Sequence, residues 1–103
     1  MPKIKLQSEY DDLDKYDCFG TIIYYKKNIN IRHNPYGPAV IWKNGSKEYH
    51  IENKIHRLDG PAIILSSGQE EYYINGKYLN KEEFEYHPER LKYLDKEHLL
   101  CLK

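Results

Sequence analysis

Hydrophobic and polar residues alternate in short runs through the middle of the chain, a pattern typical of half-buried β-strands. Val40 and Trp42 would share one face of such a strand, and alternation places His50 on the opposite face from Tyr49. Asn44-Gly45 separates two of these runs and has the composition of a tight turn, because Asn and Gly tolerate positive φ. The pattern predicts an antiparallel meander of short strands.

The middle of the chain repeats itself after 23 residues. Residues 33–41 (HNPYGPAVI) align with residues 56–64 (HRLDGPAII), and the same shift places Gly45 on Gly68 without a gap. A third, degenerate copy is inferred to begin near Tyr24. The repeat predicts β-hairpins stacked side by side, one to each unit.

The two ends of the chain have other patterns. Ile4 and Leu6 alternate with Lys, as an edge strand would, and residues 8–17 form either a short helix begun by Ser8 or a loop. A capping box at Asn80 predicts a helical turn, and a helix is expected over residues 88–101. Its apolar stripe, expected to cover one face or end of the sheet, consists of Leu91, Leu94, His98, Cys101 and Leu102.

Length and composition limit the architecture to a single domain. The chain has 103 residues, and its mean hydropathy of −0.87 and lack of a long apolar run predict no membrane-spanning segment. We expect one domain over residues 1–103, mainly β within the α+β class. It would comprise an N-terminal edge strand and acidic segment (1–19), hairpin repeats (20–79) and a C-terminal helical cap (80–103).

The unit HRLDGPAII at residues 56–64, followed by a Gly turn and EEYYINGK at residues 70–77, resembles a repeat of uncharacterised giant-virus, phage and bacterial proteins. That repeat is similar to the MORN type, which is also about 23 residues long and forms one β-hairpin per unit. The resemblance covers roughly residues 20–86. It implies a MORN-like repeat scaffold and supplies no catalytic residues.

Candidate metal and catalytic residues do not form a convincing set. His33 and His56 occupy the same repeat position, so we expect each to pack or hydrogen-bond identically beside its Gly-Pro corner. Cys18 and Cys101 have no Cys-x-x-Cys partner, whereas zinc requires converging ligands. Ser66 lies in a predicted turn without the context of a nucleophile elbow. We therefore expect no metal, no cofactor and no enzymatic activity.

The chain is rich in aromatic residues able to contact a partner, with 11 Tyr and one Trp. Tyr and Trp are enriched at protein interfaces because they combine a large contact area with a hydrogen-bonding tip. We expect Tyr49 and Tyr72 in the core, and Tyr73 and His50 exposed on the opposite face. The residues predicted to contact a partner are Trp42, His50, Tyr73, Tyr25 and Arg57.

The predicted function is a non-enzymatic protein–protein interaction module. The total formal charge is zero, but residues 21–79 carry eight basic and five acidic side chains, so one alternative is a sheet that binds single-stranded nucleic acid. A second alternative is self-assembly, in which exposed sheet edges pair between copies of the chain. Two Cys and no secretory signal favour the cytoplasm. Heavy use of Ile, Lys, Asn and Tyr is typical of A/T-rich genomes. In a virus or phage, such a binder would act on a host protein, for instance as an anti-CRISPR-like inhibitor of host defence.

Overall fold

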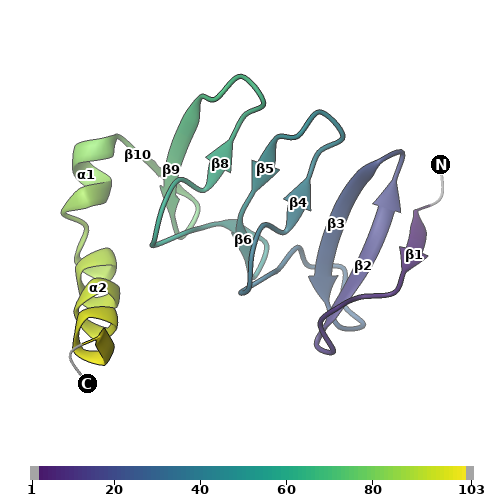
Figure 1. The fold of residues 1–103 in the computed structure, drawn as a ribbon, viewed down its shortest axis with the longest axis horizontal. Helices are drawn as coiled ribbons and strands as arrows, with labels where there is room; N and C mark the ends of the chain where they lie inside the picture. The colour runs from purple at the N-terminus through teal and green to yellow at the C-terminus, as the bar shows by residue number, and fades with distance from the viewer. Residues whose placement is uncertain (1–2, 102–103) are drawn as a thin grey trace.

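The computed structural model describes the backbone of residues 3–101 and the side chains of residues 3–95. The strands, shown in Figure 1, are β1 (Ile4–Leu6), β2 (Leu13–Cys18), β3 (Thr21–Lys26), β4 (Val40–Ile41), β5 (Lys47–Glu48), β6 (His50–Ile51), β7 (Lys54–Ile55), β8 (Ile63–Ile64), β9 (Glu70–Ile74) and β10 (Lys77–Leu79). The helices are α1 (Lys81–Glu85) and α2 (Pro88–Cys101). The expected mainly β class is therefore confirmed.

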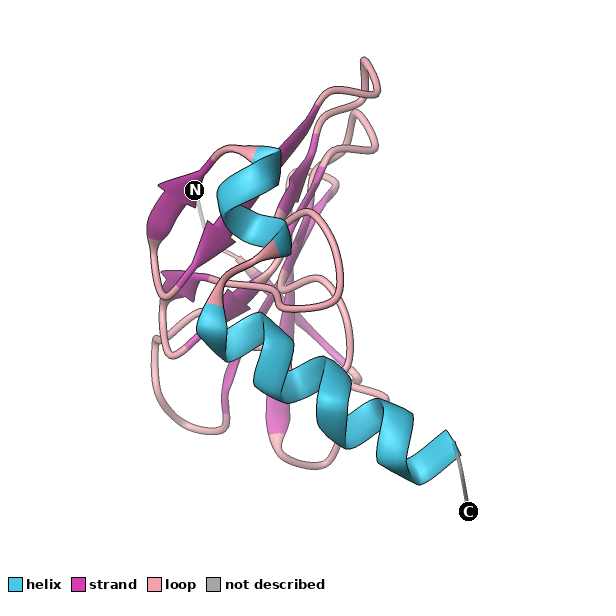
Figure 2. Ribbon diagram, turned by 90° about the vertical axis from the view of Figure 1, so that its left-hand side faces the viewer, coloured by secondary structure: helices cyan, strands magenta, loops and turns pink. Residues whose placement is uncertain are grey.

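Eight of these strands form one antiparallel sheet in the order β1-β2-β3-β4-β5-β8-β9-β10, and β6 and β7 form a separate pair. Both helices lie at the β10 end of the sheet, opposite the N-terminal strands (Figure 1). They are nearest the viewer when the molecule is seen from that end (Figure 2). Neither described helix has the length and apolar composition needed to cross a membrane.

The predicted tight turns connect the central strands. Gly45 and Gly68 have φ angles of 94° and 95°, a backbone conformation that is strained for a residue with a side chain. Gly45 N donates to Trp42 O at 2.9 Å, and Gly68 N donates to Leu65 O at 2.8 Å. The two turns therefore share one backbone geometry.

The expectation of a helix or loop over residues 8–17 is wrong for its second half. Residues 8–12 form a loop, but β2 begins at Leu13 and pairs with both β1 and β3. A positive-φ pair at Phe19 and Gly20 then reverses the chain, and Asp17 Oδ1 accepts from Gly20 N at 2.7 Å. Backbone pairing on both sides of β2 outweighs the helix-like spacing of Tyr10, Leu13 and Tyr16, which lie three residues apart.

The C-terminal predictions agree with the structure in their boundaries. Asn80 Oδ1 accepts from Glu83 N at 2.8 Å and Glu83 Oε1 accepts from Asn80 N at 3.0 Å, which completes the capping box. Helix α2 covers residues 88–101 as predicted. Leu91 is exposed, so its expected contact with the sheet is wrong. The side chains of His98 and Cys101, and all of Leu102, lie outside the described residues.

The strand register defines two faces of the sheet. Residues paired across successive strands form one row: Ile23, Val40, Glu48, Ile63 and Glu71. Side chains two positions further along return to the same face. This places four of the five predicted partner residues together: Tyr25, Trp42, His50 and Tyr73. We call this side the Trp42 face, and the side that carries Tyr49 and Tyr72 the Tyr49 face.

Two small hydrophobic clusters stabilise the sheet, one on each face. The cluster on the Trp42 face consists of Ile23, Tyr25 and Val40, with Tyr16 and Cys18 packed against them. The cluster on the Tyr49 face consists of Ile74, Leu79 and Phe84, with Leu58 and Tyr72 packed against them. Because Phe84 belongs to α1, this helix packs on the Tyr49 face.

Candidate functional site

A hydrogen-bonded network of three side chains occupies the centre of the Trp42 face. Trp42 Nε1 donates to Glu48 Oε2 at 2.8 Å, and His50 Nε2 lies 2.9 Å from Glu48 Oε1. The hydrogen bond from His50 has the largest effect and, together with that from Trp42, holds the pKa of Glu48 below its usual value of 4.5. Partial burial acts in the opposite direction. The carboxylate is thus fixed in position and negatively charged at neutral pH.

Two of the predicted partner residues on this face are not accessible. His50 is only 5% exposed, and its Nδ1 is buried and has no hydrogen-bond partner within the described part of the chain. Tyr25 is buried in the hydrophobic cluster with Ile23 and Val40, and Lys3 Nζ lies 4.3 Å from its ring centroid. The expected exposure of His50 is therefore wrong, and Tyr25, also predicted to contact a partner, is buried as well, because burial depends on packing as well as on strand alternation.

The accessible part of the Trp42 face is aromatic and acidic. Trp42 is 39% exposed and Tyr78 59%, while Tyr73 is half-buried and meets Tyr78 edge-to-face with ring centroids 5.5 Å apart. Burial raises the pKa of Tyr73, and the charges of Glu71 and Glu48 raise it further. We call this set the acidic aromatic patch: Trp42, Glu48, Ile63, Glu71, Tyr73 and Tyr78.

Basic side chains of the central strands lie mainly away from this patch. By strand register, Lys26, Lys47 and Lys77 project from the Tyr49 face. Arg32, paired through its backbone with Tyr25, lies within electrostatic reach of Glu48. The positive excess of residues 21–79 is therefore not collected beside the exposed aromatic rings.

Arg57, the fifth predicted partner residue, lies on the opposite side, at a corner between strands. Its guanidinium carbon is 4.0 Å from the ring centroid of Tyr49, and its Nε donates to Asp59 Oδ1 at 2.8 Å. Arg57 Nη1 also donates to Pro61 O at 3.1 Å. Arg57 therefore lies apart from the patch, and its side chain stabilises the corner through Tyr49, Asp59 and Pro61.

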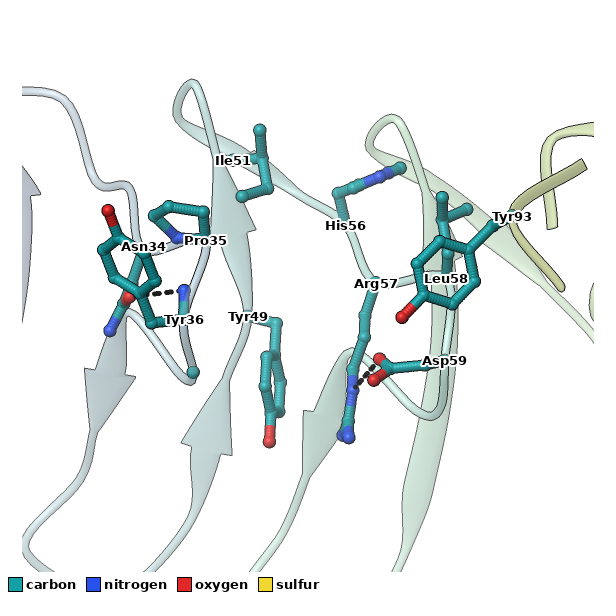
Figure 3. A pocket seen from close by; sticks show the side chains of 11 residues that line it. Asn34, Pro35, Tyr36, Tyr49, Ile51, His56, Arg57, Leu58, Asp59 and Tyr93 are labelled. Carbon is teal, nitrogen blue, oxygen red and sulfur yellow. Dashed lines mark hydrogen bonds and ion pairs between the residues drawn. The ribbon is translucent and has the colours of Figure 1, made fainter. Parts of the chain in front are cut away.

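The same corner opens into a pocket of about 330 Å³. Figure 3 shows Tyr36 on one side of Tyr49 and the Arg57–Asp59 pair on the other, with Tyr93 of α2 beyond them. The pocket mixes aromatic rings with a paired cation and carboxylate. Because Arg57 and Asp59 already neutralise each other, the pocket offers no net charge to select a ligand.

His33 and His56 have equivalent structural roles, as expected from the repeat. His33 Nδ1 accepts from Glu52 N at 3.0 Å, and His56 Nδ1 accepts from Asn75 N at 2.9 Å. Burial lowers the pKa of His56, partly opposed by the charge of Glu89. Within the described residues, no three His, Cys, Asp or Glu side chains are grouped to hold a metal ion.

Sequence reasoning missed four members of the acidic aromatic patch: Glu48, Ile63, Glu71 and Tyr78. The signal for the two carboxylates was present, because the 23-residue shift aligns Glu48 with Glu71. The exposure of Tyr78 had no such signal, since it depends on β10 being the last strand of the sheet.

We compared the chain with protein families, curated proteins and solved structures. No family model matches the chain, and neither a curated protein nor a solved structure is significantly similar to it.

Proposed function

We propose that the protein is a non-enzymatic protein-binding module and that it binds its partner through the acidic aromatic patch. The observation that carries the proposal is Trp42, which is held by its bond to Glu48 yet keeps 39% of its surface exposed. Trp and Tyr dominate binding energy at protein interfaces, and a fixed side chain loses little entropy on binding. Tyr73 and Tyr78 meet edge-to-face on the same side of the sheet, across the Glu48–Ile63–Glu71 row from Trp42.

We also infer that the scaffold is a stack of two 23-residue hairpin units of MORN-like type. Equivalent backbone bonds in the two units support this. Ala39 N donates to Glu48 O at 2.9 Å, and Ala62 N donates to Glu71 O at 2.8 Å. Each alanine is fully buried, so the units repeat in packing as well as in hydrogen bonding. In such a stack, the patch extends over both units.

The distribution of charge favours a protein partner over a nucleic acid. Single-strand platforms combine aromatic rings with cations that neutralise phosphates, and the cations dominate affinity. Here the exposed rings lie beside Glu48 and Glu71, which would repel phosphates. A nucleic acid would lose this electrostatic contribution on the face where its bases could stack.

Affinity capture from native cell extract, with nuclease treatment and quantitative mass spectrometry, tests the proposal. We expect a protein that is retained by the wild type and by Tyr86→Ala, a matched change at an exposed aromatic residue outside the patch. Trp42→Ala should reduce its recovery about tenfold or more, as loss of an interface Trp does. Equal recovery with Trp42→Ala, or loss on nuclease treatment, would contradict the proposal.

A further inference from the structure

We propose that the partner presents a basic segment whose two cationic side chains bind Glu48 and Glu71. This inference rests on the proposed function and specifies the chemistry of the partner. Both carboxylates belong to the acidic aromatic patch, are partly exposed, and flank Ile63 in the row that crosses β5, β8 and β9. The patch therefore offers two anionic positions with an aliphatic residue between them.

The spacing of these two residues follows from the sheet. Glu48 pairs with Ile63, and Ile63 pairs with Glu71, so the acidic residues lie two strands apart on one face. Adjacent strands are about 4.8 Å apart, which places the two backbone positions about 10 Å apart. Two cationic side chains at a similar spacing could each pair with one of these carboxylates.

Glu48 is prepared to bind a cation. Its two oxygens each accept one hydrogen bond, from His50 and from Trp42, and each carboxylate oxygen has capacity for a second. Its side chain keeps 20% of its surface exposed. Arg32 lies within electrostatic reach and offsets part of its charge, so Glu48 alone would attract a cation weakly.

Glu71 supplies the second and less opposed charge. Its Oε2 accepts from Gln69 Nε2 at 3.4 Å, a neutral and weak contact, and among the described residues no cationic side chain forms an ion pair with it. Its charge also acts on Tyr73, whose ring offers a cation–π surface beside it. Arginine fits this setting better than lysine, because its planar guanidinium both pairs with carboxylates and stacks on aromatic rings.

A short proline-rich peptide reproduces the required spacing. In a polyproline II helix, residues three apart lie on the same side, about 9 Å apart. The probe is therefore acetyl-Arg-Pro-Pro-Arg-amide, and the control is the same peptide with citrulline, the neutral isostere, in place of both arginines. Each is titrated into the full chain, and the chemical shifts of the Trp42 indole and of the Glu71 and Tyr73 amides are followed.

We expect the arginine peptide to shift these signals with an affinity that falls as salt is raised, and the citrulline peptide to bind at least fivefold more weakly. Glu71→Gln should weaken the arginine peptide twofold to fivefold, the range of an exposed ion pair. Glu70→Gln is the matched control, because Glu70 projects from the Tyr49 face of the same strand. Equal binding of both peptides, or an equal loss with Glu70→Gln, would overturn the inference.

The capture and titration experiments distinguish failure of the proposed function from failure of the basic-partner inference. If Trp42→Ala abolishes capture of the native partner but citrulline binds as well as arginine, the interaction module stands and the basic partner is refuted. If capture does not depend on Trp42 but the arginine peptide still needs Glu71, the proposed function fails while the cation preference of the patch is established.

Discussion

Replacing Glu48 by Gln tests whether the Trp42–Glu48–His50 network stabilises the fold. The carboxylate accepts from two donors, whereas an amide has one oxygen and must turn its NH₂ group toward one of them. Hydrogen bonds to charged groups contribute about 1.5–3 kcal/mol each, and partial exposure of Trp42 and Glu48 reduces each to about 1 kcal/mol. Because one bond is lost and the other loses its charge, we expect Glu48→Gln to lower the free energy of unfolding by about 1–2 kcal/mol at pH 7.

The loss should depend on pH with a defined sign. The pKa of Glu48 is lower in the folded chain than its usual 4.5, so ionised Glu48 stabilises the fold above that value. This contribution decreases as the pH falls through the folded pKa, because protonated Glu48 resembles Gln. The stability difference between wild type and Glu48→Gln should accordingly be largest near neutral pH and should disappear at acidic pH.

Urea unfolding between pH 7 and pH 3, followed by fluorescence of the single Trp and by circular dichroism, measures this difference. Glu70→Gln serves as the control and should change stability by no more than about 0.5 kcal/mol, as ordinary surface substitutions do. The reasoning would be refuted if Glu48→Gln were as stable as the wild type at pH 7, or if its deficit persisted unchanged in acid.

Three further substitutions test the scaffold by urea unfolding. Tyr24→Phe removes the 2.6 Å bond to Glu9 and should cost about 1 kcal/mol at pH 7, an effect that disappears in acid because this bond is the main cause of the lowered pKa of Glu9. Gly68→Ala should cost about 1–2 kcal/mol because its φ is +95°, whereas Gly37→Ala, with open space around it, should be neutral. Asn80→Ala should cost about 1 kcal/mol and speed hydrogen exchange in the first turn of α1.

Local sequence signals predicted the turns and helices because their physical causes are local. The Gly residues at 45 and 68 follow from positive φ, and the capping box at Asn80 follows from two side chains three residues apart. Strand β2 had no such local cause. Its buried Asp14 accepts from Asn28 N at 2.9 Å, a partner supplied by another part of the chain. Lys5 Nζ and Lys27 Nζ also lie 3.6 and 3.7 Å from its Oδ1. A carboxylate whose partners come from elsewhere in the chain cannot be distinguished from a solvated one in the sequence.

The candidate site was predictable in its orientation and not in its exposure. Strand alternation placed His50 and Tyr73 on the face opposite Tyr49 and Tyr72, because the two-residue period depends on backbone geometry alone. That Trp42 lies on the same face as His50 and Tyr73 follows from the register between strands. Exposure is set by neighbours on adjacent strands. Glu48 attracts His50 by a hydrogen bond, and their contact leaves the imidazole buried while Trp42 remains partly exposed. Interaction residues on a thin sheet therefore require the register as well as the alternation.

The buried imidazole has a consequence for how the patch could be specific. An isolated exposed Trp would bind many apolar surfaces, but Trp42 is fixed by the carboxylate that His50 also positions. Rotation of the indole away from Glu48 would remove one of the two donors that hold that charge. A partner that merely covers the ring leaves the carboxylate desolvated and partly unpaired, which costs binding energy. On the function we propose, a partner with a cation at that position would avoid this cost, so the bond that fixes Trp42 would also favour a basic partner.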